Sequence, residues 1–266
     1  MGEVIVVTSG KGGVGKTTIT ANLGVSLSLL GYETCLVDAD IGLRNLDLVL
    51  GIEGKIKHNL MDVSRGICTI EEALTYDIRS RKSLCMIAAS QSHFKEDLTK
   101  EKMAEVIKKL KEMFQFVLID SPAGIEYGFR NSIRNADRAL IVVNPEVSSI
   151  RDADRVIGIL EKEKIKKIEL LINRINQDLI KRKDMINLAD IEEILGIPLL
   201  GNIEEDKAIL ISSNSGKPVS YLKDSQIAFN FLQIARRLSG EHVPVVQNQE
   251  AKTESLWNKV KKTLKI

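Results

Sequence analysis

Aromatic residues are scarce in this 266-residue chain, at 4%, and it holds a single tryptophan. The hydrophobic content of 44% is ordinary for a chain with a real core. Because so few of these residues are aromatic, the core must be built mainly from isoleucine, leucine, valine and alanine. The three cysteines, Cys35, Cys68 and Cys85, include no Cys-x-x-Cys pair, which argues against a zinc site or a redox dithiol. The formal net charge of +2 favours neither a nucleic-acid binder nor a receptor for polyacidic ligands.

Signals for export and for membrane insertion are also missing. The first seven residues are mostly apolar but carry neither a basic start nor a small-residue cleavage site, so we expect a buried strand there. Gly2 is followed by Val6 at the position where a myristoylation signal has serine or threonine. No apolar stretch reaches the roughly 20 residues that a bilayer-spanning helix needs. These absences predict a cytoplasmic protein.

The chain does have a repeated alternation of short apolar runs and helical stretches. The apolar runs are continuous, which is typical of strands buried on both faces of a parallel sheet. The sequence therefore predicts an α/β fold in which a doubly wound, mostly parallel sheet is flanked by helices. The strands are expected at 3–8, 34–37, 83–88, 116–119, 139–143, 168–172 and 198–203, and helices at 15–30, 100–113, 149–162 and 224–238.

The composition changes after Ser239. Residues 240–253 contain Pro244 and several polar residues with little apolar periodicity, which predicts a flexible linker. Residues 254–266 are rich in lysine and periodic again, which predicts an amphipathic helix. We therefore expect one large α/β domain at 1–239, a linker and a C-terminal helix.

A glycine-rich loop lies between the first expected strand and the first expected helix. Its sequence, Gly-Lys-Gly-Gly-Val-Gly-Lys-Thr, matches the phosphate-binding loop, whose backbone N–H groups and following helix N-terminus bind phosphate oxygens. Lys16 is expected to contact the β and γ phosphates, and the Thr17 hydroxyl to bind Mg²⁺. The predicted nucleotide-binding residues in this loop are Gly10, Lys11, Gly12, Gly13, Val14, Gly15, Lys16, Thr17 and Thr18.

Two points about this loop allow alternatives. Gly10, Gly12 and Gly15 also fit the Gly-x-Gly-x-x-Gly dinucleotide fingerprint, but an NAD pyrophosphate needs neither the lysine nor the metal-binding hydroxyl that follow. Lys11 is an extra lysine that a plain phosphate-binding loop does not require. It is either a solvated surface lysine or a group that reaches a phosphate from an unusual direction, across a dimer interface.

Three aspartates follow expected strands. Asp38 and Asp40 come after the second strand and Asp120 ends the strand at 116–120, so all three should line the ligand crevice at the carboxyl edge of the sheet. We expect Asp120, through water, and Asp38 to join Thr17 in holding Mg²⁺, and Asp38 or Asp40 to orient the attacking water. The alternative is that each aspartate caps the helix or turn that follows it.

Four stretches together resemble the MinD/ParA family of deviant Walker A ATPases, and more closely its MinD branch. They are the loop with Lys11, residues 38–47 (Asp-Ala-Asp-Ile-Gly-Leu-Arg-Asn-Leu-Asp), residues 120–126 (Asp-Ser-Pro-Ala-Gly-Ile-Glu) and residues 144–155 (Asn-Pro-Glu-Val-Ser-Ser-Ile-Arg-Asp-Ala-Asp-Arg). The similarity runs from the first strand to about Leu238.

The resemblance implies a role for particular residues. Lys11 would contact the phosphates of the partner subunit in an ATP-dependent homodimer, and Asp152 would lie near the dimer interface. Asp40 would position the hydrolytic water, so that Lys11, Lys16 and Asp40 are the catalytic set. Asn173 would contact adenine. Relatives often have a proline near the base after the next strand, which residues 202–206 lack, so only Asn173 is assigned to the base.

The resemblance also implies a function and partners. Such a protein is a membrane-cycling ATPase with a slow basal rate that uses ATP and Mg²⁺ and places the cell-division site. It would recruit a MinC-like division inhibitor to the membrane and be stimulated by a MinE-like or other topological regulator. The competing function within the family is that of a ParA-type DNA-partitioning or flagellar-placement ATPase. For the MinD-type function we expect no specific nucleic-acid partner. A metabolic reductase or iron–sulfur carrier would need paired cysteines.

The C-terminal segment supports a membrane role. Leu256, Trp257, Val260 and Leu264 fall within about 100° of a helical wheel, and five lysines against one glutamate make residues 251–266 strongly basic. A helix this short needs a surface on which to fold, and an anionic membrane fits. The alternatives are a core-docked or coiled-coil helix or a disordered basic tail. The protein is thus expected to be reversibly peripheral on the inner face of the cell membrane.

Overall fold

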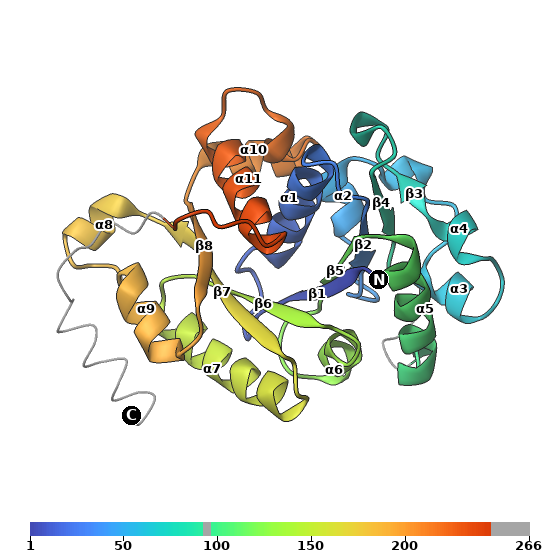
Figure 1. The fold of residues 1–266 in the computed structure, drawn as a ribbon, viewed down its shortest axis with the longest axis horizontal. Coiled ribbons are helices and arrows are strands. Elements are labelled where there is room, and N and C mark those ends of the chain that lie inside the picture. Colours follow the sequence, from blue (N-terminus) through green and yellow to red (C-terminus); the bar gives the residue numbers. More distant parts are fainter. Residues whose placement is uncertain (93–96, 246–266) are drawn as a thin grey trace.

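The structure is a computed structural model of the chain, and it describes residues 1–92 and 97–245. One eight-stranded sheet runs through the molecule in the order β3-β4-β2-β5-β1-β6-β7-β8 (Figure 1). Every neighbouring pair is parallel except β3 with β4 at one edge. The strands are β1 (Glu3–Thr8), β2 (Thr34–Asp38), β3 (Thr75–Tyr76), β4 (Leu84–Ile87), β5 (Phe116–Asp120), β6 (Arg138–Val143), β7 (Lys167–Ile175) and β8 (Leu199–Glu204).

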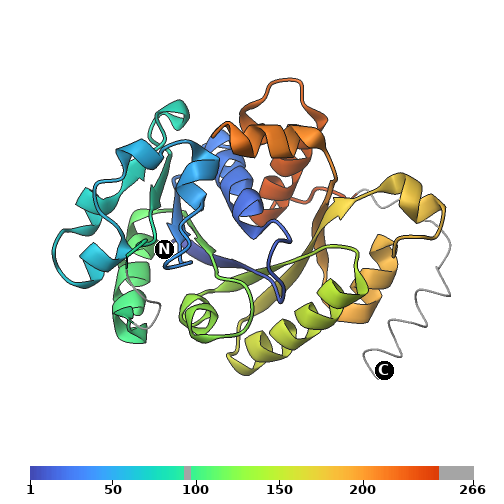
Figure 2. The same cartoon turned by 180° about the vertical axis from the view of Figure 1, so that it is seen from behind.

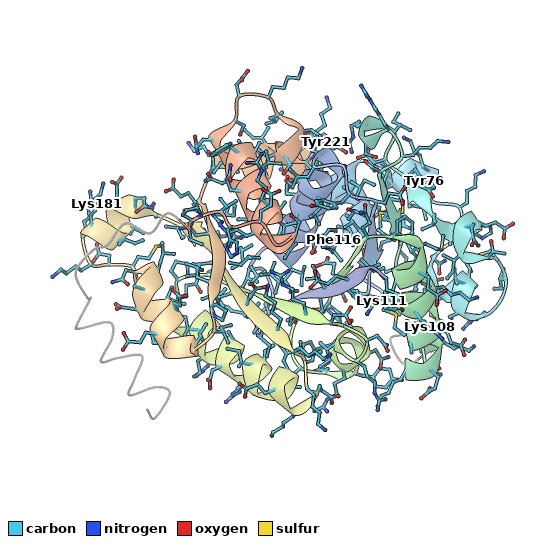
Figure 3. All side chains as sticks on the ribbon, in the orientation of Figure 1. Tyr76, Lys108, Lys111, Phe116, Lys181 and Tyr221 are labelled. Carbon is cyan, nitrogen blue, oxygen red and sulfur yellow. The ribbon has the colours of Figure 1, made fainter. Side chains whose placement is uncertain are left out.

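Helices cover both faces of the sheet, as Figures 1 and 2 show from opposite sides. One layer consists of α1 (Lys16–Leu29), α2 (Leu46–Leu50), α10 (Lys207–Asn214) and α11 (Gln226–Leu238). The opposite layer consists of α3 (Leu60–Ser64), α4 (Ile70–Ala73), α5 (Lys100–Met113), α6 (Tyr127–Ile133), α7 (Val147–Lys162), α8 (Gln177–Lys181) and α9 (Leu188–Leu195). Charged side chains such as Lys108 on α5 and Lys181 on α8 lie on the outer surface (Figure 3).

The apolar strands explain why both layers form. Val4 and Val6 of β1 pack into the core beneath α5 and α7, whereas Ile5 and Val7 pack beneath α1 and α11. Because successive side chains point to opposite faces, a continuous apolar run buries both sides of the strand. The predicted doubly wound, mostly parallel sheet flanked by helices is therefore confirmed.

Several short elements were not predicted from the sequence. The helices α3 and α4 begin at capping boxes, formed by Asn59 with Asp62 and by Thr69 with Glu72, in which the side chains satisfy free backbone N–H groups. The strand β3 has two residues and pairs antiparallel with β4. Elements this short carry too few residues to show a periodicity.

No helix within residues 1–92 and 97–245 combines the length and apolarity that crossing a bilayer requires. The chain is described up to Val245, so the predicted C-terminal helix at 254–266 lies outside the described residues.

Candidate functional site

The glycine-rich loop connects β1 to α1 at the carboxyl edge of the sheet. Gly13 and Gly15 have φ values of 76° and 99°, in the left-handed region that favours glycine. Gly15 is the N-cap residue of α1, and no described side chain caps that helix. The first-turn N–H groups are thus available to an anion, at the positive end of the helix dipole.

Lys16 lies at the start of α1 and is almost fully buried. Its ammonium donates to Ser9 Oγ at 3.0 Å, and the Ser9 hydroxyl donates to the carbonyl of Lys11 at 2.7 Å. Burial lowers the pKa of Lys16, and the carboxylates of Asp120 and Asp40 oppose that change. Ser9, which the sequence pattern does not identify, therefore holds the loop and the lysine in one arrangement.

Ser9→Ala tests this arrangement. The nucleotide-free protein is expected to lose about 1–3 kcal/mol of stability, because the buried Lys16 ammonium loses its acceptor. Bound phosphate would supply a new acceptor, so Mg·ADP should stabilise the variant more than it stabilises the wild type. Urea unfolding with and without Mg·ADP measures both values, and Ser9→Thr, which keeps the hydroxyl, is the control. An equal loss in both states would show that Ser9 acts only on the loop.

Asp38 and Asp120 end adjacent strands and are direct neighbours in the β2–β5 register. Both are buried, and burial raises the pKa of each carboxyl. The Asp120 charge raises the pKa of Asp38 further, whereas the Thr17 hydroxyl and Lys16 act to lower that of Asp120. Two crowded carboxyls beside a threonine hydroxyl are a set of hard oxygen donors that fits Mg²⁺.

The described residues contain no group of three His, Cys, Asp or Glu side chains that would hold a metal unaided. A metal at Asp38, Asp120 and Thr17 would therefore depend on phosphate oxygens and water for its remaining ligands, as Mg²⁺ sites at nucleotides do. The Thr20 hydroxyl donates a hydrogen bond to Asp120 Oδ1 at 3.3 Å and so helps to orient that carboxyl group.

The Asp38 carboxylate also accepts backbone hydrogen bonds, as the capping alternative predicted. It accepts the backbone N–H groups of Asp40 at 3.0 Å and of Asn45 and Leu46 at 3.2 Å each. It thereby shapes the loop from 40 to 45 and caps α2. Asp40 stands at the start of this loop, near enough to Lys16 to influence its pKa.

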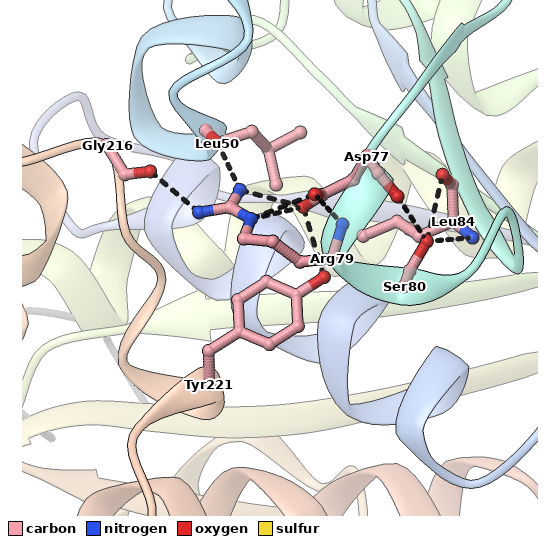
Figure 4. A network of polar contacts seen from close by, with 7 residues as sticks. All are labelled: Leu50, Asp77, Arg79, Ser80, Leu84, Gly216 and Tyr221. Carbon is pink, nitrogen blue, oxygen red and sulfur yellow. Dashed lines mark hydrogen bonds and ion pairs between the residues drawn. The ribbon is translucent and has the colours of Figure 1, made fainter.

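A network of side-chain contacts, which the sequence did not indicate, holds the C-terminal end of α2. The Arg79 guanidinium pairs with Asp77, lies 4.7 Å above the ring of Tyr221 and donates to the carbonyls of Leu50 and Gly216 (Figure 4). The Tyr221 hydroxyl donates to Asp77 at 3.0 Å. The helix α2 is thus fixed at its N-terminal end by Asp38 and at its C-terminal end by Arg79.

Lys11 lies on the surface, with 44% of its side chain exposed. Its ammonium forms an ion pair with Glu146 at 3.0 Å and donates to Ser148 Oγ at 3.3 Å, both at the start of α7. Asp152 lies one turn further along α7, and its Oδ1 atom is 3.7 Å from Nε of Arg151. Within one subunit Lys11 is therefore held against α7.

Gly10 and Asn173 fix the loop to the rest of the fold. A Cβ atom at Gly10 would lie 2.3 Å from the backbone carbonyl of Asp152, so the loop packs directly on α7. Asn173, on β7, donates from Nδ2 to the Val14 carbonyl at 2.8 Å. Its predicted contact with adenine stays a prediction. The predicted membrane residues, Leu256, Trp257, Val260 and Leu264, lie outside the described residues.

A glycine loop at a helix N-terminus, a buried lysine and strand-end carboxylates define a nucleotide-binding protein of the P-loop class. Comparison with known proteins narrows the class. The family model of the CobQ/CobB/MinD/ParA nucleotide binding domain matches residues 5–219. The chain is 46% identical to the septum site-determining protein MinD of Synechocystis over 265 residues, and this alignment covers 99% of both chains.

Solved structures agree. MinD in the MinC:MinD cell division protein complex of Aquifex aeolicus is similar with a TM-score of 0.86 and 43% identity, over 93% of this chain and 100% of that one. MinD of Pyrococcus horikoshii complexed with Mg-ADP is similar with a TM-score of 0.82 and 31% identity, over 90% and 97%. The chain therefore belongs to the CobQ/CobB/MinD/ParA family, within its septum site-determining MinD proteins. This confirms the MinD-type interpretation over the DNA-partitioning alternative.

Proposed function

We propose that this protein is an ATPase that dimerises with ATP, cycles between the cytoplasm and the inner face of the cell membrane, and recruits a MinC-like division inhibitor. The observation that carries the proposal is the pair of lysines in one phosphate-binding loop. Lys16 is buried beside Asp120 for the subunit's own nucleotide, while Lys11 is exposed on the surface.

ATP and Mg²⁺ fit the residues of the site. The loop amides and Lys16 would bind the phosphates, with Thr17, Asp120 and Asp38 around the metal, which neutralises charge on the phosphoryl group. Asp40 would orient the water, because it follows the strand that carries Asp38 and its loop is held by that carboxylate. The Mg-ADP bound by the Pyrococcus horikoshii relative supports this choice of nucleotide and metal.

Lys11 would leave Glu146 and contact the phosphates of the partner subunit when two ATP-bound copies meet. An exposed ion pair contributes about 0–1 kcal/mol, so its release is easily offset by a contact with phosphate. The MinC:MinD complex of the Aquifex aeolicus relative supports a MinC-like partner for this chain. A MinE-like or other topological regulator would stimulate hydrolysis.

Residues 254–266 would bind the membrane. Four large apolar side chains contribute roughly 6–12 kcal/mol when fully buried, and an interface buries them only in part. Each lysine adds about 1 kcal/mol near anionic lipid, while ordering the backbone costs about 1–2 kcal/mol per residue. One tail therefore binds weakly, and two tails on a dimer bind with an avidity roughly 10²–10⁴-fold higher.

Deleting residues 253–266 tests the membrane role. The shortened protein is expected to fold, bind ATP and dimerise but to stop sedimenting with anionic vesicles, because the segment that binds lipid is gone. Trp257→Glu should act almost like the deletion, since it puts a charge in the apolar arc. The control is Asn258→Glu, which adds the same charge on the opposite side of the helix.

The measurement is co-sedimentation with vesicles in ATP and in ADP, with plasmid DNA in parallel. Wild-type binding to vesicles that survives the deletion would place the membrane contact elsewhere in the chain. Binding to DNA in place of vesicles would favour the partitioning alternative.

A further inference from the structure

A groove with both apolar and polar lining residues runs between the C-terminal end of α1 and the N-terminal half of α11, at the opposite end of α1 from the nucleotide loop. It has a volume of about 460 Å³. Three of its lining residues are large apolar side chains that are half exposed: Leu29 at 55%, Leu222 at 43% and Phe229 at 53%. Single exposed apolar residues are ordinary, but three that converge on one hollow indicate a binding surface.

The last described residues lie at the opposite end of α11 from this groove. Arg237 of α11 donates to the carbonyls of Val243 at 2.8 Å and Pro244 at 2.7 Å, and also to that of Leu200 on β8 at 3.1 Å. It thereby ties the chain after α11 to the edge strand of the sheet. In Figure 1 this segment runs past β8 beside α11.

A second hollow, of about 430 Å³, connects the end of the described chain with the groove. It is lined by Val243, Pro244 and Val245 at one end and by Gln226 and Phe229 at the other. Gln226 and Phe229 line the first groove as well. The described chain therefore ends in a hollow that shares Gln226 and Phe229 with the groove.

We propose that residues 254–266 dock in the groove formed by Leu29, Leu222, Phe229 and Leu232 whenever they are not on a membrane. The eight residues at 246–253 can span up to about 28 Å, which is ample for a groove that adjoins the starting hollow. The apolar arc of the segment, Leu256, Trp257, Val260 and Leu264, matches the four large apolar side chains of the lining in character. Asp224, the charged residue of the lining, offers a partner for the lysines of the segment.

Docking within one chain does not need strong contacts. A short linker gives the segment an effective concentration of about millimolar at the groove, so even a weak interaction is well populated. The groove and the membrane then compete for the same apolar face, a consequence that rests on the proposed membrane role. The groove can hold the single tail of a monomer against lipid more readily than it can hold the two tails of a dimer, which bind lipid with avidity. Docking therefore increases the difference in membrane binding between the ADP and ATP states.

The test uses the full-length protein with ADP and without vesicles. Because Trp257 is the only tryptophan, its quenching by acrylamide reports the position of the segment alone. We expect quenching of the wild type to be about 3- to 10-fold weaker than that of Phe229→Ser, as the effective concentration implies for a weak contact. Leu210→Ser is the control, because Leu210 is 64% exposed on α10 and away from the groove.

Equal quenching of Trp257 in the wild type and in Phe229→Ser would overturn the proposal. Shielding that disappears on dilution, with a dimer in sedimentation, would also overturn it by making a second copy the occupant. If Phe229→Ser is destabilised, so that its unfolding temperature differs from that of the wild type, Leu222→Ser serves as the second groove variant. Since no vesicles are present, this result is independent of the vesicle assay: failure of docking leaves ATP-dependent vesicle binding intact, and failure of the membrane role leaves the quenching difference intact.

Discussion

Gly10→Ala is expected to abolish nucleotide binding and to destabilise the folded protein. The added methyl group would lie 2.3 Å from the carbonyl carbon and oxygen of Asp152, a distance at which one backbone must move. The helix α7 cannot easily give way, because Ile150, Ala153 and Val156 anchor it in the core. The loop would therefore shift, at about 1–3 kcal/mol or more of strain, and lose its alignment with the phosphates.

Gly12→Ala is a matched control for stability, because its added Cβ would meet only the Ala123 side chain, at 3.9 Å. Thermal unfolding without nucleotide should thus show a loss for Gly10→Ala and almost none for Gly12→Ala. Calorimetric titration with Mg·ADP then checks binding by Gly10→Ala. Binding of that variant at wild-type affinity would mean that the loop tolerates a displacement away from α7.

The sequence predicted the part of the site that depends on local pattern. The loop, Lys16 and the aspartates were predicted because phosphate and metal chemistry require particular residues at fixed spacing and at strand ends. The parallel sheet was found because its strands are continuously apolar. The sequence also suggested that Gly10 serves the phosphate, whereas the structure adds a packing reason at Asp152, 142 positions away along the chain.

Contacts between distant segments were beyond sequence reasoning. Tyr221 meets Asp77 across 144 positions, and Arg79 closes the network on two backbone carbonyls that no side-chain pattern reveals. Asp38 was assigned to the metal or to a cap as alternatives, and only the geometry shows its three backbone hydrogen bonds. Such contacts depend on how the chain packs, which local periodicity does not encode.

Lys11→Ala is expected to keep nucleotide affinity within about tenfold of the wild type but to lose ATP-dependent dimerisation. Lys16 and the loop amides remain for the subunit's own nucleotide, and a single charged hydrogen bond is worth about 1.5–3 kcal/mol at the partner's phosphate. Sedimentation velocity in ATP and in ADP measures the dimer, and nucleotide titration measures the affinity.

Glu146→Gln separates the two roles of Lys11, because it breaks the same ion pair and leaves the lysine in place. If Lys11 acts across the dimer, this variant should dimerise at least as well as the wild type. Its gain should be at most about fivefold, since the exposed pair is worth no more than about 1 kcal/mol. If Lys11 instead serves only to hold α7 through Glu146, both variants should dimerise poorly to the same extent. Wild-type dimers in Lys11→Ala would make Lys11 a surface lysine with no part in the switch.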